Sequence, residues 1–178
     1  MTRFFKETKT KGSVNLIRQK QDLDKIDALI IPGGESTTIS RTLVRSGLFE
    51  TIRNRISDDT LAIMGTCAGC VLLAKTITDN TDGCVTSLAA MDIEVQRNAF
   101  GRQKKSCECI LDFHGFSKPY TAVFIRAPVI TKVSGDCEIL AKLDKKIVAA
   151  RQHRFLAISF HPELTTDLRV HEYFLEMI

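Results

Sequence analysis

The sequence lacks any long apolar segment, and this absence limits where the protein acts. No run of 18 apolar residues occurs among its 178 residues, so we do not expect a transmembrane helix. Residues 1–11 lack an apolar core and a small-residue cleavage site, so they do not resemble a signal peptide. We therefore expect a cytoplasmic protein with no membrane partner.

A concentrated basic stripe is also absent. The formal net charge is only +4, and lysine and arginine are scattered apart from short clusters at residues 102–105 and 142–146. Proteins that bind nucleic acid usually gather basic residues on one face. We interpret both clusters as solvated loops or faces, and we do not expect a nucleic-acid partner.

Repeats, low-complexity tracts and linkers rich in proline or glycine are missing as well. Hydrophobic residues make up 44% and charged residues 26% of the chain, as in an ordinary globular protein. A chain of this length is expected to form one domain, over residues 1–178.

The cysteines lack the spacing of a complete metal site. Cys67 and Cys70 have the spacing of a redox or zinc half-site. A structural zinc site needs a second pair of ligands. Cys107 and Cys109 are a poor second pair, because alternate residues of a strand reach badly around a metal. The pattern therefore predicts no metal ion.

Strand and helix patterns alternate in the first half of the chain. Residues 29–31 and 61–64 are apolar runs that end at glycine, and each precedes a helical pattern. A helix is predicted to follow Ser36 to Thr38, which are available as its cap, and to run through about residue 45. Further helices are predicted at residues 48–56, 68–75 and 167–177. Further strands are predicted at residues 92–95, 107–111, 120–125, 138–143, 146–150 and 155–160. The pattern indicates an α/β fold of three layers, with a mostly parallel sheet flanked by helices.

The most informative segment is Gly65-Thr66-Cys67-Ala68-Gly69. It lies between a predicted strand and a predicted helix, which is the pattern of a nucleophile elbow with cysteine as the nucleophile. Small flanking residues relieve the sharp turn, and the helix N-terminus favours a thiolate. The alternative is a buried structural cysteine beside two packing glycines.

A thiolate nucleophile needs a base and a group that orients it. His161-Pro162-Glu163 follows the last apolar strand, and residues two apart in extended chain point the same way. We expect His161 to face Cys67, with Glu163 fixing its tautomer. A capping histidine and a surface glutamate are the structural alternative.

The segment Pro32-Gly33-Gly34 ends another predicted strand. Its free backbone N–H groups are suited to stabilise an oxyanion or to hold a phosphate. The segment is neither a Walker A loop nor a dinucleotide-binding glycine motif, which disfavours nucleotide binding.

Five motifs in this order extend the comparison from about Leu29 to the C-terminus. They are Pro32-Gly-Gly-Glu-Ser-Thr-Thr38, Gly65-Thr-Cys-Ala-Gly69, Gln96-Arg-Asn-Ala-Phe-Gly-Arg-Gln103, Val123-Phe-Ile-Arg-Ala-Pro128 and Ser159-Phe-His-Pro-Glu-Leu164. Together they resemble the glutaminase subunits of pyridoxal 5′-phosphate synthases, a family of class I (triad) glutamine amidotransferases. The resemblance implies hydrolysis of L-glutamine to L-glutamate and ammonia by Cys67, His161 and Glu163.

The resemblance also implies a glutamine pocket. Its expected members are Gly34, Glu35, Ser36, Arg97, Ile125 and Arg126, and the candidate oxyanion donors are Gly33, Gly34 and Ala68. Arginine suits the substrate carboxylate. Surface ion pairs are the ordinary alternative for Arg97 and Arg126.

The partner that the resemblance implies is a (β/α)8-barrel synthase subunit, which uses the ammonia to make pyridoxal 5′-phosphate in a hetero-oligomer. The resemblance implies no metal or organic cofactor in the glutaminase itself. Vitamin B6 is then the product of the pathway and not a ligand of this chain.

The N-terminus departs from the family pattern. Family members usually begin with an apolar strand and a Leu-Gln-Gly turn, whereas residues 1–21 are charged. Val14 to Ile17 resembles the family's second strand. We therefore expect a sheet without one inner strand, and an effect on coupling to the synthase.

Four alternatives remain open from the residues. They are the glutaminase of another amidotransferase, a related α/β cysteine hydrolase or chaperone-like protein, a regulatory subunit without turnover, and a thiol-redox protein that uses Cys67 and Cys70. The His-Pro-Glu segment disfavours the second alternative. The fourth predicts that Cys70→Ser is as damaging as Cys67→Ser.

Overall fold

A computed structural model describes residues 1, 11–97, 99 and 106–178. The helices are α2 (Lys20–Leu23), α3 (Ser36–Arg45), α4 (Leu48–Ser57), α5 (Ala68–Leu73), the 3-10 helix η1 (Pro162–Leu164) and α6 (Arg169–Leu175). The strands are β1 (Ala28–Ile31), β2 (Ala62–Thr66), β3 (Ala74–Ile77), β4 (Met91–Gln96), β5 (Cys107–Leu111), β6 (Tyr120–Phe124), β7 (Val129–Val133), β8 (Glu138–Leu143), β9 (Lys146–Gln152) and β10 (Phe155–Ile158).

The main sheet has eight strands in the order β1-β2-β10-β9-β7-β4-β3, with β8 paired to β9. The pairs β1–β2, β2–β10 and β3–β4 are parallel. The pairs β10–β9, β9–β7, β7–β4 and β8–β9 are antiparallel. The predicted α/β fold is confirmed, and the sheet is parallel where β1, β2 and β10 lie side by side.

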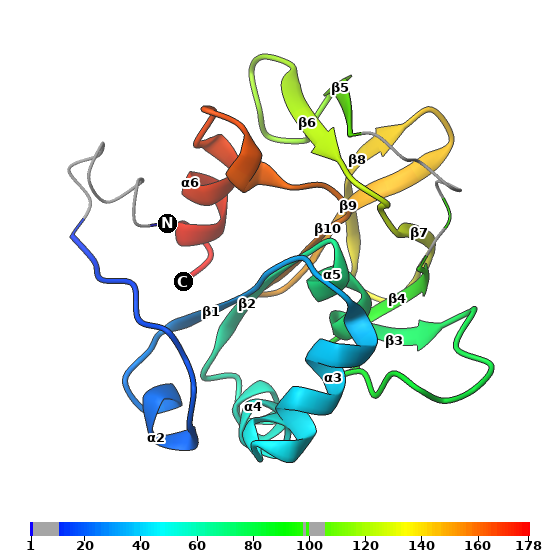
Figure 1. Ribbon diagram of the computed structural model, residues 1–178. Coiled ribbons are helices and arrows are strands. Elements are labelled where there is room, and N and C mark those ends of the chain that lie inside the picture. Colours follow the sequence, from blue (N-terminus) through cyan, green and yellow to red (C-terminus); the bar gives the residue numbers. More distant parts are fainter. Residues whose placement is uncertain (2–10, 98, 100–105) are drawn as a thin grey trace.

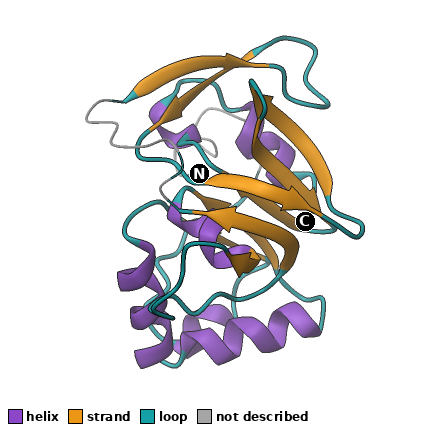
Figure 2. Cartoon of the chain, turned by 90° about the vertical axis from the view of Figure 1, so that its right-hand side faces the viewer, coloured by secondary structure: helices purple, strands orange, loops and turns teal. Residues whose placement is uncertain are grey.

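Helices cover one face of this sheet, and α6 with the β5–β6 hairpin covers the other (Figures 1 and 2). Residues of β2 alternate between the two faces, as the period of a strand requires. Ile63 belongs to the cluster that contains Phe49 and Ile52 of α4, whereas Met64 belongs to the cluster that contains Phe174 of α6. Because both faces of β2 are covered, the strand is buried throughout and its first three residues are all apolar.

Most predicted elements are present with small shifts at their ends, and two strands were missed. The predicted helix 68–75 ends at Leu73, because Ala74 and Lys75 belong to β3. No glycine or proline separates α5 from β3, so the sequence has no signal for this boundary. Strand β7 follows Pro128 directly and was not predicted.

Two local predictions are wrong. Val14 to Ile17 does not form a strand, and Val14 and Leu16 are exposed. A strand needs a hydrogen-bonding neighbour, and none of the described strands pairs with this segment. The cap of α3 is not supplied by Ser36 to Thr38. Glu35 is the N-cap, and its carboxylate accepts hydrogen bonds from the N–H groups of Thr37 and Thr38 at 2.9 and 2.7 Å.

Within the described ranges, no helix is long and apolar enough to cross a membrane. The basic cluster at residues 102–105 lies outside these ranges. In the second basic cluster, Lys142 and Lys145 are exposed, as expected for a solvated face.

Candidate active site

Three neighbouring parallel strands end at the same edge of the sheet, and each leads into one of the predicted segments. Ile31 of β1 lies opposite Gly65 of β2, and Thr66 of β2 lies opposite Ile158 of β10. The glycine loop follows β1, Cys67 follows β2, and His161 follows β10 by three residues. The parallel register therefore brings segments from distant parts of the chain together, at the end where α/β folds place their sites.

Cys67 occupies a sharp turn between β2 and α5. Its backbone has φ 49° and ψ −105°, a conformation that is rare and strained for a residue other than glycine. The N–H of Cys67 donates a 2.8 Å hydrogen bond to the carbonyl of Ile158, which ties the turn to β10. This is the predicted nucleophile elbow.

The glycines on either side of the elbow permit a close approach of backbones. A Cβ at Gly65 would overlap the carbonyl of Gly69, and a Cβ at Gly69 would overlap the carbonyl of Ile31. Neither obstacle is a flexible side chain, so a larger residue would force the first turn of α5 away from the sheet. The glycines flanking Cys67 are thus required by packing.

His161 and Glu163 are joined directly. Nδ1 of His161 lies 2.7 Å from Oε1 of Glu163, and the His161 side chain is only 11% exposed. The predicted geometry was an extended chain, whereas Glu163 lies in the 3-10 helix η1. The N–H of His161 donates a 2.8 Å hydrogen bond to the carbonyl of Val123 in β6, which fixes the histidine backbone.

The His161 ring also interacts with Cys67. Nε2 of His161 is buried and makes no hydrogen bond within the described part of the chain. The interaction with Cys67 is the largest effect on this group, followed by the hydrogen bond with Glu163, and together they raise the pKa of His161 to about 9 against the effect of burial. Burial acts to raise the pKa of Glu163, but the hydrogen bond with His161 helps to outweigh it, so the pKa is lowered. The surroundings of His161 thus favour its protonated form beside Cys67 and Glu163.

Two shallow surface hollows lie away from these residues. One of about 500 Å³ is lined in part by Arg151, His153 and Arg154. The other, of about 600 Å³, is lined in part by His114 and Phe116. Neither is lined by Cys67, His161 or Glu163, so the chemistry of the side chains, and not the size of a hollow, identifies the candidate site.

Comparison with known proteins agrees with this geometry. Residues 3–178 match the SNO glutamine amidotransferase family. The chain belongs to this family. A solved glutamine amidotransferase structure superimposes with a TM-score of 0.84 at 44% identity, covering 90% of this chain and 84% of that one. The solved structure of a putative GMP synthase component from Thermoplasma acidophilum is 16% identical with a TM-score of 0.61, covering 89% of this chain and 76% of that one, and it shares the fold.

Curated relatives carry a more specific name. A protein of Fervidobacterium nodosum is 46% identical over 163 residues, which cover 92% of this chain and 83% of the relative. A protein of Pelotomaculum thermopropionicum is 50% identical over 161 residues, which cover 90% of this chain and 80% of the relative. Both are named pyridoxal 5'-phosphate synthase subunit PdxT.

The oxyanion candidates of this amidotransferase lie at the edge that holds Cys67 and His161. A Cβ at Gly33 would lie 3.3 Å from Cβ of Cys67, so the glycine loop is adjacent to the nucleophile. Ala68 is the buried first residue of α5, directly after Cys67. Gly34 has a φ of 150° and is exposed beside Gly33.

The residues expected to bind glutamine differ in their exposure and in the contacts that they make. The Glu35 side chain is occupied by the cap of α3, and Ser36 is buried at the start of that helix. Nη2 of Arg97 donates a 2.8 Å hydrogen bond to the carbonyl of Asp79, beyond β3. Arg126 is exposed, with a left-handed φ of 45°. Asn98 and residues 100–103 of the same predicted motif lie outside the described residues.

Ile125, an expected member of the pocket, places its carbonyl 3.9 Å from Sγ of Cys67. Three other contributors to the site were not found from the sequence. Val123 and Ile158 act through backbone carbonyls, and Asp79 holds Arg97. Because a backbone carbonyl can come from any residue type, only the tertiary pairing of strands identifies Val123 and Ile158.

Proposed function

We propose that this amidotransferase hydrolyses L-glutamine to L-glutamate and ammonia, as the glutaminase subunit of a pyridoxal 5′-phosphate synthase. The observation that carries the proposal is the alignment of three groups: Cys67 at the elbow, His161 with its buried Nε2 free of described partners, and Glu163 at 2.7 Å from Nδ1. In this arrangement Cys67 is the nucleophile, His161 the base and Glu163 the orienting carboxylate.

In the first half-reaction the Cys67 thiolate attacks the side-chain amide carbon of glutamine. The carbonyl oxygen becomes an oxyanion, which the backbone N–H groups of Gly33, Gly34 and Ala68 are suited to stabilise. Collapse of this intermediate breaks the C–N bond, and protonated His161 gives its proton to the departing nitrogen. The products are ammonia and a γ-glutamyl thioester on Cys67.

In the second half-reaction neutral His161 takes a proton from water, and the resulting hydroxide attacks the thioester carbon. The C–S bond breaks, and glutamate leaves with its new carboxylate. Glu163 stabilises the imidazolium that forms each time, because its carboxylate accepts the Nδ1–H hydrogen bond. Its half-exposed position, at 48% of the side chain, weakens this effect relative to a fully buried carboxylate.

The proposed glutamine site lies across the ends of β1, β4 and β6. The backbone at Gly34, Glu35 and Ser36 borders the nucleophile through Gly33, and Ile125 contacts Cys67. Arg97 and Arg126 supply positive charge for the α-carboxylate of the substrate. The capped side chain of Glu35 is not free to bind the substrate amine, so any contact from this residue is assigned to its backbone.

The proposed partner is a (β/α)8-barrel synthase subunit, and the two form a cytoplasmic hetero-oligomer that transfers ammonia. The chain is proposed to act as a single domain over residues 1–178. Two alternatives are kept: a glutaminase that serves another amidotransferase, and a regulatory subunit without turnover. The first would pair with a different synthase, and the second would not release glutamate.

The experiment measures glutamate release from L-glutamine with and without the barrel synthase, for wild type and Cys67→Ala. Release that depends on Cys67 and rises with the synthase is expected. Release that is indifferent to the barrel synthase would favour another partner. No release under either condition would overturn the glutaminase proposal.

A further inference from the structure

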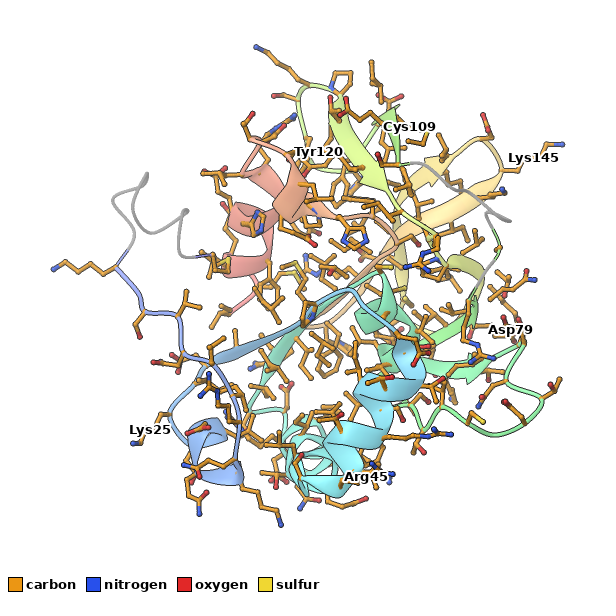
Figure 3. The ribbon with its side chains drawn as sticks, viewed as in Figure 1. Lys25, Arg45, Asp79, Cys109, Tyr120 and Lys145 are labelled. Carbon is orange, nitrogen blue, oxygen red and sulfur yellow. The ribbon has the colours of Figure 1, made fainter. Side chains whose placement is uncertain are left out.

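Two cysteines outside the active site lie in direct contact on β5. Sγ of Cys107 is 3.2 Å from Sγ of Cys109, and both side chains are partly exposed. The two thiols share one face of the strand because Glu108 between them points to the other. Cys109 is labelled on the β5–β6 hairpin in Figure 3.

This hairpin supports the backbone of His161. Strand β5 pairs with β6 in a two-stranded sheet, with Glu108 opposite Val123 and Cys107 opposite Phe124. The carbonyl of Val123 accepts the backbone hydrogen bond of His161. The residue between the two thiols is therefore paired with the residue that holds the catalytic histidine.

We propose that Cys107 and Cys109 form a redox site, which a low-molecular-weight disulfide such as oxidised glutathione converts to an intrachain disulfide that lowers turnover. The mapping of this disulfide stands alone, whereas its effect on turnover rests on the proposed glutaminase function. Cys67 and Cys70, the other cysteines at close spacing, are both buried.

The reaction proceeds by two exchanges. The Cys107 thiolate attacks one sulfur of glutathione disulfide, forms a mixed disulfide and releases one glutathione thiolate. The Cys109 thiolate then attacks the Cys107 sulfur, forms the intrachain S–S bond and releases the second glutathione. The two cysteines lose two electrons and two protons, and one glutathione disulfide becomes two glutathione thiols.

The surroundings of Cys109 suit it to the second, intramolecular step. Burial, followed by the interaction with Cys107, raises the pKa of Cys109 to about 11.

Closing the disulfide shortens β5. Residues two apart in a strand have Cα atoms about 6.6 Å apart, whereas disulfides favour Cα separations of about 5.5–6 Å. The strand must therefore contract at Glu108. Because Glu108 pairs with Val123, the contraction shifts the carbonyl that fixes His161. A displaced base slows the reaction, by about tenfold or more for a shift approaching 1 Å.

The test equilibrates the full chain, together with the barrel synthase, in glutathione buffers of increasing oxidation. The thiols are then alkylated, and mass spectrometry measures the mass of the tryptic peptide of residues 106–126. This peptide contains Cys107, Cys109 and no other cysteine. The variants are Cys107→Ser, Cys109→Ser and the double serine variant. Cys84→Ser serves as the matched control, because Cys84 is also partly exposed but has no cysteine partner.

In wild type and Cys84→Ser, we expect the oxidised peptide to carry no alkyl group. Its mass should be that of the peptide with two free thiols less two hydrogen atoms. Glutamate release should fall at the same buffer oxidation at which half of the peptide becomes disulfide-bonded. It should return after reduction by dithiothreitol, while the double serine variant keeps its activity. Full alkylation in oxidised buffer, or glutathione adducts alone, would overturn the site. Equal loss of activity in the double variant would assign the effect to Cys67 and overturn the coupling. Absence of turnover in fully reduced wild type would instead contradict the proposed function, and the peptide mass would still decide the disulfide.

Discussion

Gly33 lies against the ring of His161: a Cβ added at Gly33 would be 2.5 Å from Cε1 and 3.2 Å from Nδ1 of that imidazole. The same Cβ would be 3.3 Å from Cβ of Cys67. The loop after β1 thus fixes the space in which the nucleophile and its base meet. A glycine here leaves room for the histidine ring.

Gly33→Ala is therefore expected to displace His161 and to lower kcat about 100-fold, as for other small displacements of catalytic groups. The fold should survive, because Gly33 does not have a left-handed φ that would strain an alanine. Glutamate release and thermal unfolding measure the two effects. Gly83→Ala is the control: nothing lies within 4 Å of its new Cβ, and its φ of 63° costs stability, about 1 kcal/mol, without touching the site. Full turnover in Gly33→Ala would show that His161 lies elsewhere.

Variants of Cys67 and Cys70 separate hydrolysis from thiol-redox chemistry. Cys70 is fully buried, and burial raises the pKa of its thiol far above the usual range. We expect Cys67→Ala to abolish glutamate release with little change in folding. Cys70→Ser should keep most turnover and lose about 1–3 kcal/mol of stability, because its hydroxyl is buried. Equal loss of activity in the two variants, with equal folding, would favour the redox alternative.

Glu163 orients His161 and helps to keep it protonated. Glu163→Gln should lower the pKa of His161 from about 9, and Cys67→Ala should lower it further, because the interaction with Cys67 is the larger cause. NMR titration of the His161 ring in wild type and both variants measures this order. The kcat of Glu163→Gln should fall about 100-fold, less than for a buried triad carboxylate, since Glu163 is half-exposed. An unchanged His161 pKa in both variants would contradict the triad.

The sequence predicted the parts of the site that depend on residue type and strand ends. Gly65, Cys67 and Gly69 form a pattern that is specific to a sharp strand-to-helix turn, and His161 follows an apolar strand. Adjacent parallel strands then bring Gly33, Cys67 and His161 to one edge. The local sequence pattern was sufficient for these parts, because the sharp turn and the proposed chemistry require the same residue types at the same positions.

The remainder depends on tertiary pairing, which local pattern does not contain. The separate β5–β6 hairpin and the carbonyl of Val123 follow from which strands become neighbours. Glu35 outcompetes Ser36 to Thr38 as the cap because its longer side chain reaches two N–H groups at once. Val14 to Ile17 has strand-like residues but no strand partner among the described elements.

His171 on α6 gives the fold a defined dependence on pH. It is buried, and its Nδ1 has no hydrogen-bond partner among the described residues. Burial, followed by the positive charge of the N-terminus, lowers the pKa of His171 to about 4, and Glu163 opposes this effect. In the unfolded chain the pKa of histidine is about 6.5, so the unfolded state binds more protons between these values. The stabilising contribution is therefore present above about pH 6.5 and is lost as the pH falls towards 4.

The expected loss across this window is at most about 3 kcal/mol. Urea unfolding at several pH values between about 4 and 7 measures it, with His171→Leu as the comparison because leucine fills the space and does not titrate. Carboxylates that titrate in the same range contribute equally to both proteins and cancel in the difference. The raised pKa of His161 acts in the opposite direction, since its stabilisation is lost between about pH 6.5 and 9, outside this window. Parallel stability curves for wild type and His171→Leu would show that His171 is protonated in the folded protein.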